Sequence, residues 1–427
     1  MEEKSQNKDI YKLSRFMYIL EAAFEYFVSL SVTSVYLAKV TSYLNVSDSL
    51  TGILSSFVSL GCGFQLIAIF LAGKRPVKRW VTIGHIISQL LFAFIYVVPL
   101  LDLSFTAKTV IFVIVMLCAY VIHNVIHAPK INWYMSLIDD DKRGRFTANK
   151  EIVSLIGGMA YSYGLGALVD YFESKGDMRS ALITCGAVVF TLMLLHSLTL
   201  FFSKEKPAEQ KTDKTSTLKA IGELFRDKDF LKIILVFSMW STAAYTTVSF
   251  MGTYQTKELG FSLTFASVII MIGSIIRAVI SRTMGKFADK YSFAKMLTVC
   301  FIIVAVGFGI NAFTVPSNGK ILYTVYYILY CTAMAGISNA SINLIYDYVE
   351  PRQRIQALAV NATFSGFAGF LVTLLMSRLV AHIQQNGNRF LGIPIYAQQV
   401  MSIFSFIITV VLIAYMLTVV PKIKRKG

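Results

Sequence analysis

Two carboxylates lie four residues apart inside the first long apolar stretch of the chain. They are Glu21 and Glu25, within the segment YILEAAFEYFVSLSVTSVYLAK at residues 18–39. Four residues is about one helical turn, so both side chains would point to the same side of a helix. Because a carboxylate facing hydrocarbon costs several kcal/mol, this pair must face a cavity or a partner, or be protonated.

A candidate partner is Arg277, eight residues before Gly285 in a later apolar stretch. Glu21 and Arg277 are each expected roughly 12 Å from the same face, given a rise of about 1.5 Å per residue. We therefore predict that they pair across the two halves of the protein. We also predict that Glu25 carries a proton or contacts a solute, and that Glu21 or Arg277 adjusts the proton affinity of Glu25. The alternative is a static ion pair that only holds helices together.

A second polar group follows a helical spacing in the apolar stretch near 107–136. It consists of His123, Asn124 and His127, and Pro129 should kink this helix. Histidines at i and i+4 can bind zinc, but the sequence offers no third ligand nearby, so no metal site is predicted. The group is interpreted as lining a cavity and relaying protons, with interhelical hydrogen bonding as the alternative.

Further polar residues recur in two later apolar stretches. Asn339, Asn343 and Asp347 are spaced by four residues and predict a polar helix face that lines a cavity for a polar solute, with Asp347 at its cytoplasmic end. Tyr245 is a candidate contact for a solute, with packing as the alternative. His85 and His196 are interpreted as anchors at the membrane interface, because they fall on helices expected to be peripheral.

The composition is that of a membrane protein. Of the 427 residues, 56% are hydrophobic and 15% are charged, which is too apolar for a soluble chain of this length. The net charge of +16 does not indicate nucleic-acid binding, because the basic residues are dispersed among separate loops. The five cysteines lie in apolar stretches without CxxC spacing, so neither a disulfide framework nor a zinc site is expected.

Apolar runs long enough to cross a bilayer predict an all-α membrane protein of twelve transmembrane helices in two six-helix bundles. The bundles are expected at 1–202 and 230–427, with a cytoplasmic linker at 203–229. The predicted spans are 13–38, 49–72, 80–100, 107–136, 148–172, 179–202, 230–256, 262–285, 292–315, 320–347, 355–383 and 396–420.

The basic residues orient these spans. Thirty of the forty Lys and Arg residues fall on the side of the termini, seven on the opposite side and three within predicted helices. Basic loops stay in the cytoplasm. Both termini are therefore expected in the cytoplasm, and the protein in the cytoplasmic membrane.

The two halves contain related segments. SLIDDDKRGRFTANKEIVSLIGG at 136–158 and DYVEPRQRIQALAVNATFSGFAG at 347–369 align at an offset of 211, which places Arg143 on Arg354 and Gly158 on Gly369. In both segments a charged loop leads into a helix with small residues at every fourth position, which lets helices approach closely in lipid. This indicates an internal duplication.

The loop after the predicted eighth span, Gly285-Lys-Phe-Ala-Asp289-Lys290 with Lys295 following, resembles a signature of the major facilitator superfamily. KRGRF at 142–146 resembles the matching basic segment. The resemblance covers essentially the whole chain and implies two bundles that rock about a central site. It also implies a cytoplasmic gate, to which we assign Asp289, Lys290, Arg143, Arg145 and Asp347. The first loop, AGKRPVKRW, departs from the signature because it lacks the acidic residue.

The expected function is secondary active transport of a small, partly polar solute, coupled to protons or another ion. The chain lacks the GxxxxGK[ST] motif, so ATP hydrolysis is not expected. We expect no enzyme activity, no cofactor, no nucleic-acid partner and a monomer in the bilayer. A multidrug exporter is the alternative within the class, although the antiporter motifs of the fourth and fifth spans are missing. A lipid flippase and a non-transporting sensor are alternatives of other classes.

Overall fold

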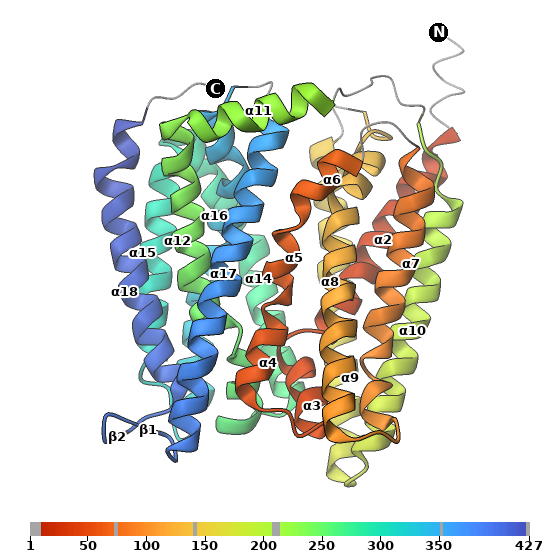
Figure 1. Cartoon of the computed structure of the whole chain (residues 1–427), viewed down its shortest axis with the longest axis vertical. Helices are drawn as coiled ribbons and strands as arrows, with labels where there is room; N and C mark the ends of the chain where they lie inside the picture. The colour runs from red at the N-terminus through yellow and green to blue at the C-terminus, as the bar shows by residue number, and fades with distance from the viewer. Residues whose placement is uncertain (1–9, 72–75, 140–142, 207–213, 351–352, 424–427) are drawn as a thin grey trace. The chain divides into compact units, whose positions relative to one another are not determined.

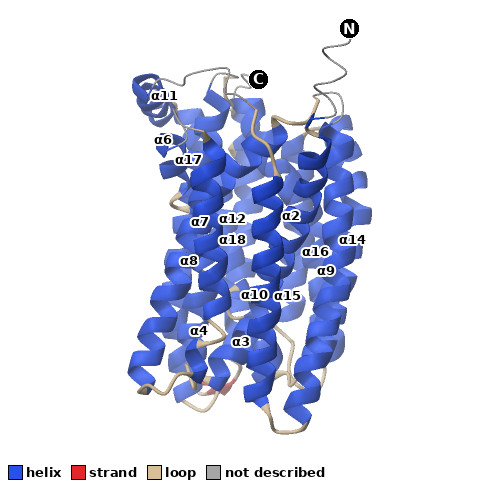
Figure 2. Cartoon of the chain, turned by 90° about the vertical axis from the view of Figure 1, so that its right-hand side faces the viewer, coloured by secondary structure: helices blue, strands red, loops and turns tan. Residues whose placement is uncertain are grey.

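The computed structural model describes residues 10–71, 76–139, 143–206, 214–350 and 353–423, and nearly all of them are helical (Figure 2). The strands among these residues form one hairpin, in which β1 (Arg389–Phe390) pairs antiparallel with β2 (Ile393–Pro394). The prediction of an all-α architecture is confirmed.

Ten described helices are long and apolar enough to cross a membrane. An eleventh span is the pair α2 (Lys12–Ser31) and α3 (Ser34–Tyr43), which meet at a bend of 45°. Helix α7 (Val77–Phe94) is not among them and carries two basic residues and His85, but it occupies the place of the third predicted span. With α7 included, the helices match the twelve predicted spans.

Contacts divide the chain into two compact units. The first comprises Met1–Val46 with Ile67–Asp213, and the second comprises Ser47–Leu66 with Lys214–Gly427. Besides α2, α3 and α7, the first unit contains η1 (Val98–Leu100), α8 (Phe105–Met135), α9 (Arg143–Ser174) and α10 (Met178–Phe202). The second contains α4 (Asp48–Ser55), α5 (Phe57–Cys62), α11 (Lys214–Arg226), α12 (Lys228–Val248), α13 (Met251–Thr253), η3 (Tyr254–Glu258), α14 (Leu263–Lys290), α15 (Phe293–Asn311), α16 (Gly319–Tyr348), α17 (Arg354–Gln385), α18 (Ala397–Thr418) and η5 (Val420–Lys422). Helix α6 (Gln65–Leu71) spans the boundary.

The two units repeat one packing scheme, as expected from the duplication in the sequence. In the first unit α2 packs on α9 and α10, and α7 packs on α8 and α10. In the second unit the corresponding helices do the same, with α12 on α17 and α18, and α15 on α16 and α18. The long helices of each unit run side by side along a common direction (Figure 1).

The glycines that align at the offset of 211 occupy equivalent close contacts. A Cβ at Gly158 in α9 would lie 2.3 Å from Tyr26 Cε1 in α2. A Cβ at Gly369 in α17 would lie 2.5 Å from Ser59 Oγ and 2.7 Å from Tyr245 Cδ2. Small residues therefore permit the predicted close approach of helices in both units.

The region of the second predicted span contributes α4 and α5 to the second unit, where both pack on α17. Ser59 Oγ donates to the carbonyl of Gly366 at 2.9 Å, and a Cβ at Gly366 would lie 2.5 Å from the Ser59 carbonyl oxygen. At the start of α4, Asp48 accepts from Lys257 Nζ at 2.5 Å and from Gln384 Nε2 at 2.7 Å. The two units therefore differ in this span, because its helices α4 and α5 belong to the second unit although they precede most of the first unit in sequence.

The bend of the first span leaves backbone carbonyls without helical partners, and side chains of the first unit satisfy them. The hydroxyl of Tyr96 donates to the Ser31 carbonyl at 2.5 Å, and the hydroxyls of Ser31 and Tyr161 are also 2.5 Å apart. Ser34 follows with a φ of +48°, outside the range of a right-handed helix. The bend is thus held by hydrogen bonds rather than left open.

Helix α11, within the predicted linker, crosses the end of the second unit (Figure 1). It packs on α12 and α17 through the buried Leu224 and the partly buried Ile221. Gln353 Nε2 donates to Glu223 Oε2 at 2.7 Å and ties α11 to the start of α17.

Candidate functional site

The site is built on one face of α2. Tyr18, Glu21 and Glu25 are spaced by three and four residues, so their side chains share that face. Glu21 is completely buried, whereas 16% of the Glu25 side chain is exposed. Both carboxylates reach the same cation, which confirms that they point the same way.

The cation is Lys130 of α8. Its Nζ lies 2.6 Å from Glu21 Oε1 and 2.6 Å from Glu25 Oε2, and only 2% of its side chain is exposed. Lys130 directly follows Pro129, which lies inside α8. The ammonium therefore bridges the two carboxylates within the interior of the first unit. A buried charge of this kind is stable only when it is paired.

Two further helices extend the network on the Glu21 side. His196 Nε2 in α10 lies 2.9 Å from Glu21 Oε1, and His85 Nε2 in α7 lies 3.0 Å from His196 Nδ1. Both imidazoles are completely buried. The interpretation of His85 and His196 as interface anchors is therefore wrong. They face the interior of the unit, where His196 contacts Glu21 and His85 contacts His196.

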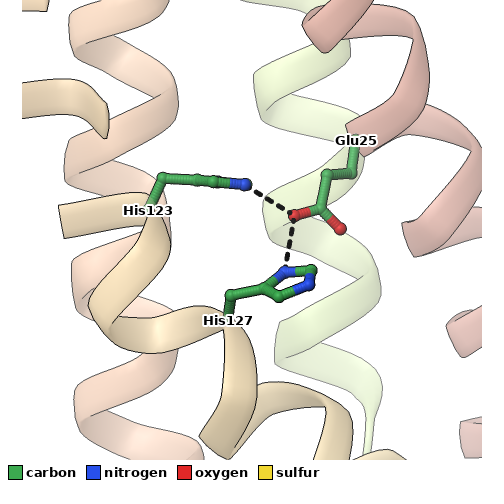
Figure 3. Close-up of side chains that lie close together, drawn as sticks. All are labelled: Glu25, His123 and His127. Carbon is green, nitrogen blue, oxygen red and sulfur yellow. Dashed lines mark ion pairs between the residues drawn. The ribbon is translucent and has the colours of Figure 1, made fainter. Parts of the chain in front are cut away.

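The predicted histidine pair meets the other side of Glu25. His123 Nε2 lies 3.4 Å from Glu25 Oε1, and His127 Nδ1 lies 3.7 Å from the same oxygen (Figure 3). Both imidazoles project from α8 toward the carboxylate of α2. The expectation that no carboxylate lies near this pair is wrong, because the third residue comes from a different helix.

An aromatic stack supports the cluster next to Glu21. The rings of Tyr18 and Tyr134 are parallel with centroids 4.4 Å apart, and Trp133 stacks on Tyr134 at 4.7 Å. Lys150 Nζ lies 4.9 Å from the centroid of the Tyr18 ring. These rings pack α2 against α8 beside the buried Glu21 and Lys130.

The cluster carries an excess of negative charge. Glu21 and Glu25 contribute two negative charges and Lys130 contributes one positive charge, so the cluster has a net charge of −1 when its histidines are neutral. In a region of low dielectric constant such an imbalance attracts a proton or another cation more strongly than it would in water. The arrangement can therefore bind a positive charge at Glu25, where the cluster is accessible.

One prediction about contacts of the cluster needs correction. Glu21 pairs with Lys130 and His196 rather than with Arg277. Arg277 belongs to the second unit, where its guanidinium lies 3.5 Å from Ser338 Oγ. Asn124 lies on α8 beside the histidines, and its amide donates to the backbone carbonyl of Tyr120 at 2.9 Å.

The other predicted residues whose side chains the structure describes belong to the second unit. Tyr245 of α12 packs at the close contact with Gly369. Asn343 and Asp347 lie on α16 and are partly buried. Asp289 and Lys290 are exposed at the end of α14, and Lys290 Nζ lies 5.3 Å from the centroid of the Tyr291 ring. The assignments of these residues to a solute path and a gate remain predictions.

Three predicted side chains lie outside the described part of the structure. They are those of Arg143, Arg145 and Asn339, whose backbones belong to α9 and α16. Their proposed roles in gating and solute binding stay predictions.

Sequence reasoning missed Lys130, the residue at the centre of the cluster. It was counted among the cytoplasmic loop charges because it follows Pro129 near the end of an apolar stretch. The usable signal was its spacing, since Lys130 lies seven residues after His123 and three after His127, on the same face of a helix.

Comparison with known families identifies the fold. The family model of the Major Facilitator Superfamily matches residues 19–373. A comparison with curated proteins gives no match.

Solved structures of transporters share the fold over nearly the whole chain. The nucleoside transporter NupG is 18% identical with a TM-score of 0.72, covering 96% of this chain and 100% of its own. A D-xylose-proton symporter is 14% identical with a TM-score of 0.69, covering 93% and 97%. A bacterial homologue of the human lysosomal transporter Spinster, in an inward-facing conformation, is 15% identical with a TM-score of 0.65, covering 96% of each chain. Together with the family match, the two units of helices and the apolar spans, these similarities show that this multi-pass membrane protein belongs to the Major Facilitator Superfamily.

Proposed function

We propose that the chain is a secondary active transporter that moves a small, partly polar solute by alternating access and couples this movement to protons. The observation that carries the proposal is the buried bridge of Lys130 between Glu21 and Glu25. Ionisable residues inside a membrane domain are costly and usually serve transport. A purely structural role is less well supported, because a buried ion pair adds little stability compared with apolar packing.

The charge balance of the cluster suggests how coupling works. Without a bound proton the cluster has one uncompensated negative charge, which opposes its enclosure in a dry interior. A proton on Glu25 removes that charge and leaves Lys130 to Glu21 alone. The neutral cluster can then be enclosed at lower cost, so proton binding favours the conformational change that carries the solute.

Similar structures suggest a class of solute. NupG is a nucleoside transporter and another similar protein is a D-xylose-proton symporter. Nucleosides and sugars are small, polar and uncharged, and hydrogen-bonding residues such as Asn343 and Tyr245 of the second unit suit them. We place the protein in the cytoplasmic membrane as a monomer, with both termini in the cytoplasm, as the distribution of basic residues indicates.

The test is uptake by purified protein in proteoliposomes. A panel of nucleosides and sugars is first screened by thermal shift, because a ligand stabilises the state that binds it. Stabilising compounds are then assayed with an imposed pH gradient of either direction. We expect the gradient to drive accumulation by the wild type, and Glu25→Gln to abolish that accumulation while exchange without a gradient continues.

The matched control is Glu173→Gln, since Glu173 pairs with Lys39 at the surface, with 43% of its side chain exposed. This variant should transport like the wild type. Accumulation by Glu25→Gln equal to that of the wild type would remove Glu25 from the coupling mechanism.

A further inference from the structure

We propose that Glu25, His123 and His127 form a binding site for one divalent transition-metal ion of the Zn²⁺ type. The inference concerns metal binding alone and does not depend on the proposed transport cycle. It rests on the geometry of three side chains from two helices of the first unit, α2 and α8 (Figure 3).

The three ligand atoms lie close to one another. Glu25 Oε1 lies 3.4 Å from His123 Nε2 and 3.7 Å from His127 Nδ1, and one ligand atom from each residue lies within 4.8 Å of the others. Ligands at about 2.0–2.2 Å from a tetrahedral zinc ion are about 3.3–3.6 Å apart. The two measured separations are close to this range, so small side-chain rotations would complete the site.

Hydrogen bonding does not account for the arrangement. A hydrogen bond from an imidazole nitrogen to a carboxylate is about 2.7–3.2 Å long, shorter than either separation. Among the described residues, Glu25 Oε1 and His127 Nδ1 are buried atoms without a hydrogen-bond partner. A metal ion would satisfy such unpartnered buried atoms that lie close together.

The surroundings favour a cation with nitrogen and oxygen ligands. The cluster of Glu21, Glu25 and Lys130 has one excess negative charge, so the ammonium of Lys130 does not prevent cation binding. Lys130 donates to Glu25 Oε2 and thereby orients Oε1 toward the histidines, as residues around metal ligands commonly do. Two imidazoles and one carboxylate match the ligand preferences of Zn²⁺ and Co²⁺.

The side chains around the site are partly exposed. The His127 side chain is 40% exposed, and that of His123 is 21% exposed. Three protein ligands leave one position of a tetrahedron unfilled, which water or a polar group of a solute would occupy. A metal site with such an open position differs from a closed structural site.

The test uses full-length protein in detergent, with any polyhistidine tag removed, at one fixed pH. Cobalt(II) is added, and the visible absorption of tetrahedral cobalt is recorded. We expect one equivalent to bind with the spectrum of nitrogen and oxygen ligands, and zinc to displace it.

Variants then locate the ion. Glu25→Gln, His123→Gln and His127→Gln should each weaken binding by more than about tenfold, since even residues around a metal ligand contribute factors of this size. His382→Gln is the matched control, because His382 lies in the second unit beside Asn386 and should leave binding unchanged. Monodispersity and the thermal midpoint show whether each variant folds.

The proposal is overturned if the folded wild type gives no cobalt spectrum. It is also overturned if each of the three single variants binds cobalt as tightly as the wild type. Because transport is not measured, either result leaves the proposed transport function standing. Conversely, a failure of proton-driven uptake leaves the metal site intact.

Discussion

Lys130 decides the character of the buried cluster, because it is the cation that both carboxylates share. Two carboxylates this close in a dry interior would repel each other strongly without it. Removing one member of a buried ion pair typically costs about 3–5 kcal/mol, because the partner charges remain unpaired. The stability of the first unit should therefore depend on this single side chain.

We predict that Lys130→Met lowers the thermal midpoint of the purified protein, corresponding to a loss of about 3–5 kcal/mol. Lys39→Met is the control, because Lys39 pairs with Glu173 near the surface at 2.6 Å and should contribute less than about 1 kcal/mol.

A double substitution separates charge from packing. Glu21→Gln together with Lys130→Met leaves Glu25 as the only carboxylate of the pair, at the accessible end of the cluster, and should recover part of the lost stability. Equal midpoints for Lys130→Met and Lys39→Met would show that the bridge contributes no more than a surface pair.

For single residues, the sequence indicated that the two carboxylates and the two histidines could have a function. It did not indicate that these two groups lie next to each other. Helical spacing indicates which residues of one helix share a face, so Glu21 with Glu25 and His123 with His127 could be recognised. Spacing does not show which helices are neighbours. Arg277 was expected beside Glu21 on equal depth alone, whereas Lys130 and His196 come from helices that pack on α2.

At the scale of the helices, α5 and α17 approach each other closely through their backbones. A Cβ at Gly366 would lie 2.5 Å from the Ser59 carbonyl oxygen and 2.9 Å from the Gly63 amide nitrogen. Backbone atoms cannot rotate away as a side chain can, so this contact requires glycine. The aligned segments of the sequence pointed to Gly369, and the structure adds Gly366 as a second close contact of α17.

Gly366→Ala should therefore force α5 and α17 apart and cost about 1–3 kcal/mol by overpacking. Gly164→Ala is the matched control within a helix, because no atom lies within 4 Å of a Cβ at Gly164. This control should be neutral or stabilising by up to about 1 kcal/mol, since alanine favours helix. Thermal unfolding of both variants in detergent provides the comparison. Similar midpoints for the two would contradict the close contact.

Hydropathy located most of the membrane spans. Two features differ from a simple apolar span, the charged start of α7 and the bend in the first span. Helix α7 carries Lys78, Arg79 and His85, which lower its apolar character although it packs in the first unit as a span does. The first span contains a bend of 45° that an unbroken apolar run does not indicate. The bend depends on tyrosines from other helices, which local sequence cannot place.

For the whole molecule, the distribution of basic residues predicts which loops face the cytoplasm. Lys219 lies on α11, in the linker predicted to be cytoplasmic, and Arg389 lies in the β1–β2 hairpin, which is predicted on the other side of the membrane. Both are exposed in the structure. When one cysteine is added at either position, a membrane-impermeant maleimide should label Arg389→Cys in intact cells. It should label Lys219→Cys only after permeabilisation.

The parent protein, with its five cysteines in apolar helices, gives the background of this experiment. Labelling of Lys219→Cys in intact cells would reverse the assigned orientation. Lys130 was one of the thirty residues counted on the cytoplasmic side, and its burial removes it from that count. The remaining bias is still large, so the predicted orientation does not change.

The internal duplication was recognisable because equivalent glycines recur at a fixed offset and perform the same packing task. What the offset could not show is that one span departs from the symmetry. Repeated sequence indicates repeated local packing, whereas the pairing of α4 and α5 with α17 depends on contacts between distant parts of the chain.

The placement of α4 and α5 has a consequence for any attempt to divide this protein. A fragment ending at residue 206 would take with it two helices that belong to the second compact unit, and a fragment starting at 214 would leave the Gly366 face of α17 bare. Lys257 would lose the carboxylate of Asp48 at the same time. The two sides of the linker therefore do not coincide with the two compact units, and the piece starting at 214 would lack residues 47–66 of its own unit.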